Sequence, residues 1–356
     1  NLAMKVLVTG DSGYIGSILA PMLVKNGYQV VGFDTDFFSQ RGGSAFGGKT
    51  GASSPKNSYK KITKDIREIK LSDLLGFDSI IHLSALSNDP MGEIDPKLTE
   101  KINHKASVRL ASLAKKAGIR RFLFSSSCSI YGIAKKDFVD EKSEVNPLTA
   151  YAKSKIDTEK ALIALSDENF CVGILRNSTV YGFSPSFRND LVVNNFVSCA
   201  LAYGQIRIMS DGSPWRPLID VRDLSKIFME FLTVSEKKIN GQIINIGFSE
   251  NNFQVKDIIA KVQKYVPNCK VVYTGEHRDA RSYKVNFAKF KSIFPKITQD
   301  WTLDRSIEDM VKNLKMLKFS KKDFESGNFT RLTILKNLMS KNLINSKLYW
   351  EKEFKE

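Results

Sequence analysis

The sequence of 356 residues predicts an α/β fold, a doubly wound parallel sheet with a smaller lobe interleaved with it. Short apolar strands alternate with amphipathic helices over residues 4–180, which is the pattern of such sheets. A glycine-rich turn joins the first strand to the first helix. Beyond residue 181 loops and mixed elements replace the alternation, and a strand over 241–248 then returns to the core pattern.

The first strand, residues 4–10, leads through TGDSGYIG into a helix that stops at Gly27. Gly10 permits the turn, Gly13 lets the backbone approach a pyrophosphate, and Gly16 allows the helix to pack closely. Phosphates are favoured at the start of this helix, where free N–H groups and the dipole attract negative charge. An ordinary glycine-rich turn is the alternative interpretation.

The second strand, residues 29–34, ends in Asp34. A carboxylate at this position accepts a hydrogen bond from an adenosine ribose and repels a 2′-phosphate. The glycine turn and Asp34 together therefore predict a dinucleotide site that takes NAD rather than NADP.

Four further strands are expected over 60–65, 79–87, 120–132 and 170–177, and helices over 95–117 and 149–168. Residues 39–60 are rich in Gly, Ser and Lys and are expected to form a surface loop, and a polar turn region follows residue 132. Because ligands bind at the carboxyl ends of parallel strands, Gly10, Asp34, Ala85 and Ser127 are expected to share one site.

The second half is expected to contain a helix over 191–204, a strand, turn and returning strand over 205–224, and a helix that ends near residue 235. We predict a dinucleotide-binding domain over 4–180 with 218–248 returning to it, and a substrate lobe over 181–217 and 249–317. Residues 318–356 form a basic, helical extension whose apolar side chains pack onto the body or onto another subunit.

Composition excludes several classes of protein. No stretch approaches the roughly 20 apolar residues of a membrane span, and the beginning of the chain is typical of a strand rather than a signal peptide. Cysteines that lie far apart without a Cys-x-x-Cys motif fit reduced thiols, which predicts a cytoplasmic protein. Four widely spaced cysteines and three scattered histidines predict no metal, and His82 is expected to be a core residue. The net charge of +16 is dispersed along the chain, which favours attraction of anionic substrates over nucleic-acid binding.

The stretch from Phe122 to Lys155 carries the expected chemistry. Tyr151 and Lys155 are four residues apart and share one face of a helix. An ammonium beside a phenol favours phenolate, so the pair is suited to accept a proton near neutral pH. Ser127, near the end of the preceding strand, is placed to hydrogen-bond the same substrate hydroxyl. Two exposed residues of an amphipathic helix are the alternative, which the upstream motifs disfavour.

In this order the motifs resemble the extended short-chain dehydrogenase/reductases, specifically the NAD-dependent epimerase/dehydratase family of nucleotide-sugar enzymes. The resemblance covers residues 4–317 and rests on TGDSGYIG, Asp34, Asp65-Ile66, HLSA, SSSCSIYG, YAKSK, RNSTVYG and RPLIDVRD. It implies a Rossmann-type sheet, bound NAD, a nucleotide-diphosphate sugar as substrate, and a homodimer joined through helices over 95–117 and 150–168.

The resemblance also implies roles for individual residues. Ser127, Tyr151 and Lys155 match the catalytic residues. Further NAD contacts match Gly10, Gly13, Tyr14, Ile15, Gly16, Asp34, Asp65, Ile66, Leu83, Ala85 and Lys155. Substrate contacts match Asn88, Ser127, Thr179, Tyr181, Arg216 and Arg281, where the two arginines suit a diphosphate or ribose and surface ion pairing is the alternative.

Two departures narrow the expected reaction. The dehydratases of the family carry an Asp-Glu pair where this chain has Cys128-Ser129, and an Asn of the family's pattern is replaced by Thr179. We therefore expect an epimerase that transiently oxidises a sugar hydroxyl, at C4, by hydride transfer to NAD. A dehydrogenase or ketosugar reductase with the same residues is the alternative reaction, and a non-catalytic NAD-binding scaffold or sensor is the alternative class.

Overall fold

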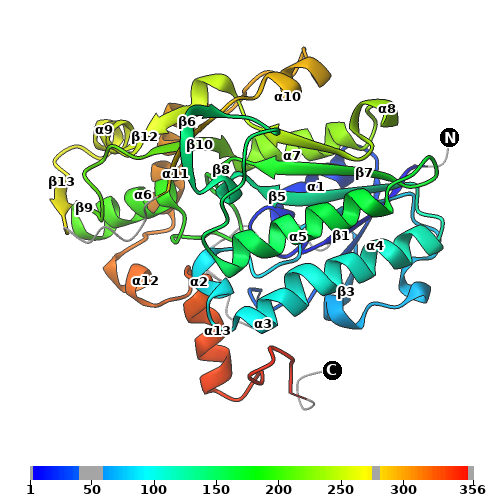
Figure 1. Ribbon diagram of the computed structural model, residues 1–356. Helices are drawn as coiled ribbons and strands as arrows, with labels where there is room; N and C mark the ends of the chain where they lie inside the picture. The colour runs from blue at the N-terminus through cyan, green and yellow to red at the C-terminus, as the bar shows by residue number, and fades with distance from the viewer. Residues whose placement is uncertain (1–2, 40–58, 275–280, 352–356) are drawn as a thin grey trace.

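A seven-stranded parallel sheet in the order β11-β7-β5-β4-β1-β2-β3 forms the centre of the molecule in the computed structural model (Figure 1). The structure describes residues 3–39, 59–274 and 281–351. The strands are β1 (Lys5–Thr9), β2 (Gln29–Asp34), β3 (Lys60–Thr63), β4 (Ser79–His82), β5 (Arg121–Ser127), β7 (Cys171–Asn177) and β11 (Gln242–Ile246). Each lies within a range that the sequence predicts, and the doubly wound fold class is confirmed.

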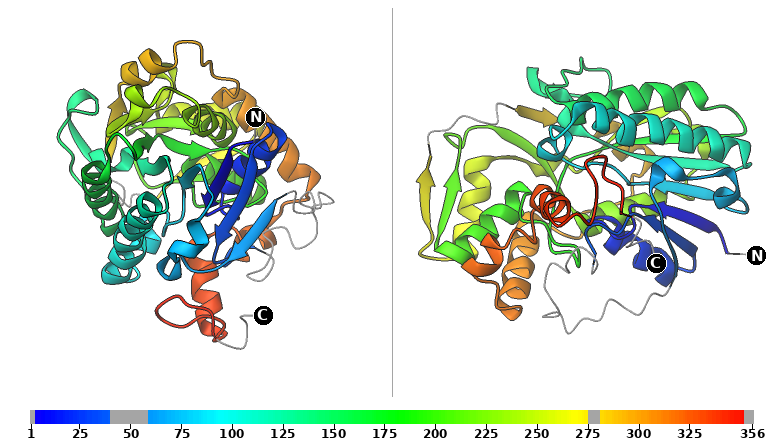
Figure 2. Two further views of the ribbon diagram at one scale, coloured as in Figure 1. Left: turned by 90° about the vertical axis from the view of Figure 1, so that its right-hand side faces the viewer. Right: turned by 90° about the horizontal axis from the view of Figure 1, so that it is seen from below.

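Alternate side chains of each strand enter two different cores, which explains the continuous apolar runs. Val6 and Val8 of β1 pack in one core with α1 (Gly16–Lys25) and α7 (Val221–Phe231). Leu7 packs in the other with α4 (Ala106–Lys116) and α5 (Ala150–Leu165). The sheet is therefore covered by helices on both faces (Figure 2).

The helix expected over 95–117 is divided into α3 (Pro96–Thr99), a π-helical turn (Glu100–Lys105) and α4. Asn103 of this turn is buried and forms two hydrogen bonds with the backbone of Leu86, accepting from its N–H at 2.8 Å and donating to its carbonyl at 3.1 Å. π-Turns inside helices are frequent at functional sites. Here the turn fixes the chain that follows β4.

The strands outside the main sheet pair in ways that the sequence did not predict. β9 (Gln205–Ile208) and β10 (Trp215–Asp220) form within the range of the expected strand, turn and return, but they do not pair with each other. β9 pairs with β13 (Lys270–Tyr273), and β10 lies between β8 (Thr179–Tyr181) and β12 (Asn252–Gln254). The polar turn region after residue 132 contains β6 (Ile133–Val139), parallel to β14 (Ser282–Val285). Distant partners of this kind leave no local signal.

A third large core joins the lobe helices α6 (Val192–Tyr203), α9 (Val255–Tyr265) and α11 (Leu303–Met316). The shorter helices are α2 (Asp89–Gly92), α8 (Glu236–Ile239), α10 (Ala288–Ile293) and α12 (Lys321–Glu325), and 3₁₀ turns cover Ile66–Glu68, Leu71–Leu74, Cys128–Tyr131 and Ser249–Asn251. None of the helices in the described part of the chain is long and apolar enough to cross a membrane.

The C-terminal extension packs onto the body, one of the two outcomes expected for it. Its helix α13 (Arg331–Ser340) buries Ile334, Leu335 and Leu338 in a cluster that includes Leu86. The chain then folds back, and Trp350 donates its indole N–H to the carbonyl of Thr35 at 2.6 Å. Figure 2 shows this red segment beside the blue N-terminal strands. Residues 40–58 of the expected loop and 352–356 of the extension lie outside the described residues.

Candidate active site

A cavity of about 670 Å³ lies at the carboxyl ends of the main strands. It is lined by all but one of the candidate site residues: Gly10, Gly13, Tyr14, Ile15, Gly16, Asp34, Asp65, Ile66, Leu83, Ala85, Asn88, Ser127, Tyr151, Lys155, Thr179, Arg216 and Arg281. Tyr181 is the exception: its side chain is fully buried in the lobe core, and its hydroxyl donates to the carbonyl of Trp301 at 3.4 Å. The structure therefore does not bring Tyr181 to the expected substrate site.

The glycine turn leaves no room for side chains. Gly10 has φ +77°, and a Cβ there would lie 3.0 Å from the amide nitrogen of Ser84. A Cβ on Gly16 would lie 2.1 Å from the carbonyl oxygen of Gly10. Gly10, Gly13 and Gly16 also line the cavity at the start of α1, where N–H groups and the helix dipole favour an anion.

Two acidic side chains, Asp34 and Asp65, line the cavity at the end that also contains the glycine turn. Asp34 accepts hydrogen bonds from the backbone N–H groups of Asp36 at 2.8 Å and Ser12 at 3.2 Å. Burial, and then the nearby carboxylate of Asp11, raise the pKa of Asp34 to about 6. Asp65 is engaged by Arg67, whose Nε and Nη2 donate to its two oxygens at 2.8 and 2.7 Å.

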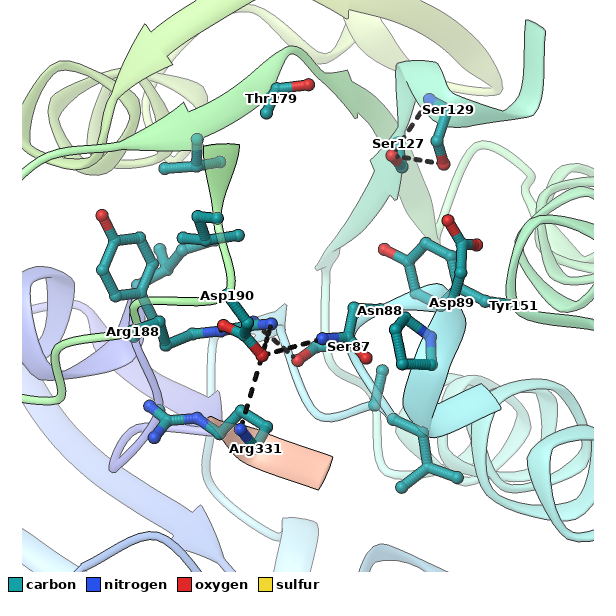
Figure 3. A pocket seen from close by; sticks show the side chains of 18 of the residues that line it. Ser87, Asn88, Asp89, Ser127, Ser129, Tyr151, Thr179, Arg188, Asp190 and Arg331 are labelled. Carbon is teal, nitrogen blue, oxygen red and sulfur yellow. Dashed lines mark hydrogen bonds and ion pairs between the residues drawn. The ribbon is translucent and has the colours of Figure 1, made fainter. Parts of the chain in front are cut away.

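The residues expected to carry the chemistry meet at the other end. Thr149 caps α5 by accepting from the N–H of Ala152 and donates its own hydroxyl to Asp89 at 2.6 Å, which positions Tyr151 in the first turn. Lys155 donates to the carbonyl of Ser125 at 2.8 Å, and its Nζ lies 5.6 Å from the centre of the Tyr151 ring. Figure 3 shows the hydroxyl of Ser127 on the same side of the cavity as the Tyr151 phenol.

The electrostatics differ from the sequence expectation. Burial, and then the carboxylate of Asp89, raise the pKa of Tyr151 to about 12, while a hydrogen bond with Ser127 and the charges of Arg188 and Arg281 lower it. Burial also lowers the pKa of Lys155 to about 8. Lys155 donates to a backbone carbonyl rather than to the phenol, so its charge does not offset the burial of Tyr151.

Two arginines border the cavity beyond Tyr151. Arg216 donates to the carbonyl of Arg281, and Arg281 forms an ion pair with Asp89 at 2.7 Å. Asn88 caps α2 and donates to Asp190 at 3.0 Å. The expected substrate arginines are thus adjacent, although they come from distant parts of the chain.

Sequence reasoning missed several residues that line the cavity, namely Asp89, Asn177, Arg188, Asp190, Asn195, Arg207, Arg331 and Leu348. Arg188 is 4% exposed and donates to both oxygens of Asp190, at 2.8 and 3.1 Å, and to Ser87 at 3.0 Å (Figure 3). The only sequence feature that could have indicated some of these residues was the presence of charged residues in the loop-like segment 177–190. Nothing in the sequence pattern connected the extension to this site.

A sequence model of the NAD dependent epimerase/dehydratase family matches residues 6–247. The chain belongs to this family. The family's enzymes act on nucleotide sugars with NAD, and both statements hold for this chain. The resemblance that the motifs predict is therefore confirmed.

Three relatives show how broad the likeness is. An uncharacterised UDP-glucose epimerase, YtcB of Bacillus subtilis, is 30% identical over 69% of this chain and 78% of its own length. The dTDP-D-glucose 4,6-dehydratase of Mus musculus is 26% identical over 91% of this chain and 94% of its own. A structure of UDP-glucuronic acid 4-epimerase from Bacillus cereus, in complex with UDP-glucuronic acid and NAD, has a TM-score of 0.77 and 25% identity, and the match covers 88% of this chain and all of that one. Family membership therefore does not distinguish epimerase from dehydratase.

The residues present fit NAD. The side chain of Asn177 donates to Ser125 at 2.9 Å, but its buried carbonyl oxygen has no hydrogen-bond partner in the described structure. A buried acceptor without a partner is unusual, and Asn177 lines the same cavity as Asp34 and the glycine turn. At the opposite end, Asp34 is placed for a ribose and the glycine turn for a diphosphate.

Proposed function

We propose that the protein is an NAD-dependent nucleotide-sugar epimerase that transiently oxidises a sugar hydroxyl at C4. The observation that carries the proposal is one continuous cavity: the glycine turn and Asp34 lie at one end, Ser127 and Tyr151 further along, and Arg216 with Arg281 beyond them. The arginine pair supplies the donors and charge that suit a diphosphate.

Each residue has a distinct part in this reaction. Ser127 holds the sugar hydroxyl, and Tyr151 takes its proton and later returns it. Lys155, already bound to Ser125, positions the ribose beside the nicotinamide. When bound, oxidised NAD supplies the hydride acceptor and a positively charged ring. Burial raises the pKa of Tyr151 to about 12, and the positive ring of a bound oxidised NAD would favour its ionised form.

The residues after Ser127 argue against dehydration. Cys128 is fully buried and donates to the carbonyl of Arg176, and burial raises the pKa of its thiol well above the ordinary value. Ser129 forms a hydrogen bond with Ser127 at 2.9 Å. Neither side chain supplies the acid and base that loss of water requires. A dehydrogenase or ketosugar reductase uses the same residues and is the remaining alternative reaction.

A panel of UDP-, GDP-, CDP- and dTDP-sugars tests the proposal. An epimerase converts one of them without a lasting change in nicotinamide absorbance. Stoichiometric formation or consumption of NADH would instead identify a dehydrogenase or reductase. A 4-keto-6-deoxy product would identify a dehydratase and contradict the role given to Cys128 and Ser129.

Removal of the Tyr151 hydroxyl tests whether the protein is an enzyme in which Tyr151 transfers the proton. Tyr151→Phe is expected to lower kcat by about 10²- to 10⁴-fold, the usual contribution of a general acid or base, and to leave bound NAD unchanged. Tyr273→Phe is the matched control, since Tyr273 is 63% exposed. If Tyr151→Phe retained full activity, or if no sugar were turned over by the wild type, the non-catalytic scaffold would be the better interpretation.

The homodimer remains part of the proposal. It places α4 and α5, within the expected ranges 95–117 and 150–168, at the subunit interface. A native mass measurement distinguishes the dimer from the monomer.

A further inference from the structure

Arg331, the first residue of α13, places a buried guanidinium in the cofactor cavity. The residue is 2% exposed. Its Nη2 donates to the carbonyl and hydroxyl oxygens of Ser186, at 2.8 and 2.6 Å, and the guanidinium carbon lies 4.6 Å from the centre of the Phe38 ring. Among the described residues no carboxylate forms an ion pair with it.

The carboxylate of Asp190 is already engaged by other donors. It accepts from Nε and Nη2 of Arg188 and from the amide of Asn88, and from Arg331 it accepts only the backbone N–H, at 3.4 Å. Two buried guanidinium groups therefore share one carboxylate. Burial and the neighbouring Arg188 lower the pKa of Arg331 to about 9, so it stays charged at neutral pH. Asp190 and Asp34 offset the burial of this guanidinium only in part, so it favours a further anion brought into the cavity.

The surroundings of Arg331 indicate which anion fits. Tyr14, in the glycine turn, and Asp34, at the ribose end, both act on it electrostatically. In Figure 3 its side chain extends from α13 away from Asp190, toward the blue ribbon of the N-terminal residues. The guanidinium thus lines the same cavity as Asp34 and the glycine turn, and a dinucleotide bound to those two features would have its diphosphate between them.

We propose that Arg331 binds the diphosphate of NAD, so that the C-terminal extension is part of the cofactor site. The glycine turn offers backbone N–H groups from one side, and Arg331 offers a charged, forked donor from the other. The anion neutralises the excess charge of the Arg188, Asp190 and Arg331 group. Ser186 fixes one edge of the guanidinium and leaves the other edge for the ligand.

The end of the extension closes the adenosine side. Arg67, which is held by Asp65, donates to the carbonyls of Lys347 and Leu348, both at 2.8 Å, and lies 3.6 Å over the ring of Tyr349. Leu348 consequently lines the cavity that Asp65 and Ile66 also line. The extension therefore contacts the dinucleotide at two points, through charge at Arg331 and through an apolar side chain at Leu348.

Binding measurements with NAD-free protein separate these two contacts. Arg331→Gln is expected to weaken the binding of NAD and of ADP-ribose by about 10- to 100-fold, as expected for the loss of a charged hydrogen bond. The affinity for adenosine, which has no phosphate, should not change. Arg331→Lys restores part of the affinity. Lys336→Gln, an exposed residue of the same helix, is the control and leaves all three affinities unchanged. Leu348→Ala should weaken the binding of NAD, ADP-ribose and adenosine by the same factor.

Thermal unfolding distinguishes this role from a purely structural one. If Arg331 binds the diphosphate, Arg331→Gln removes a charge that is offset only in part, so the NAD-free protein keeps its Tm while the rise in Tm on adding NAD shrinks. If Arg331 only anchors α13 to Ser186, the NAD-free Tm falls and the NAD affinity is unchanged or declines in parallel with that of adenosine. Either of the latter results overturns the proposal. Neither readout depends on which sugar is turned over.

Discussion

Asp34, which lines the cofactor end of the cavity, has a second carboxylate close to it, that of Asp11, whose charge raises the pKa of Asp34. Asp11 is buried beside it, accepts a hydrogen bond from Tyr59 at 3.0 Å, and has its own pKa raised by burial. The pKa of Asp34, about 6, is high enough to matter near physiological pH. Because ribose hydroxyls donate to the carboxylate, NAD requires Asp34 in its ionised form.

NAD affinity should therefore depend on pH. Above pH 6 Asp34 is ionised and the affinity is constant; below it the fraction ionised, and with it the affinity, falls by about tenfold per pH unit. Titration of NAD by fluorescence across this range measures the effect. Asp11→Asn removes a charge that raises the pKa of Asp34, so the inflection in the plot of NAD affinity against pH should move to lower pH. An affinity that does not change through pH 6, or an inflection unmoved by Asp11→Asn, would contradict this assignment.

The residue scale also shows what sequence could and could not predict. His82 was expected to be a core residue because its strand is apolar, and its Nδ1 and Nε2 indeed lie 2.7 Å from the hydroxyls of Thr9 and Ser107. The raised pKa of Tyr151 was not predictable, because it depends on burial and on Asp89, Arg188 and Arg281 from three other segments.

At the scale of elements, α5 joins the catalytic residues to the sheet through a buried ion pair. Glu159 accepts from Nε and Nη2 of Arg176 at 3.0 and 2.7 Å, and Arg176 also donates to Tyr131 at 3.0 Å. Both charged residues are nearly inaccessible to water. Removing one partner of such a pair leaves the other charge buried and uncompensated.

Glu159→Ala is accordingly expected to lower the free energy of unfolding by about 3–5 kcal/mol. Asp157→Ala, on the same helix, removes only the ion pair with Lys153, whose side chain is 71% exposed, and should cost under about 0.5 kcal/mol. Urea unfolding of both variants measures the difference. Equal losses would mean that the buried pair contributes no more than a surface pair.

The elements of the main sheet were predictable because strands buried on both faces are continuous apolar runs. The π-helical turn was not, since its buried Asn103 bonds to the backbone of Leu86 in another segment, which no local pattern indicates. The pairing of β6 with β14 escaped prediction for another reason: β6 reads IAKKDFV, in which charged residues interrupt any apolar pattern, and its partner is far along the chain.

At the scale of the whole molecule, the site residues that were predicted belong to motifs along the main sheet, and those that were missed include residues of the C-terminal extension. Glycine spacing and strand ends identify the predicted residues, because ligands bind where parallel strands end. Arg331 reaches the cavity only because α13 packs against Leu86 and Leu98. Such packing joins segments from opposite ends of the chain, and no short-range pattern encodes it.

The net charge of +16 acts on the molecule as a whole and gives a last prediction. Of the described residues, five arginines, two lysines and four aspartates line the cavity, so its local charge has the same sign as the overall charge. Association of an anionic nucleotide sugar is then steered electrostatically and slows as salt screens the field.

The rate constant for UDP-glucose binding, measured by stopped flow, should fall about tenfold from low salt to about 0.5 M. Uridine, which lacks the diphosphate, should bind at a nearly constant rate, and duplex DNA should show no steep dependence of affinity on salt. A steep slope for DNA, or equal slopes for uridine and UDP-glucose, would mean that the basic surface does not serve the cavity.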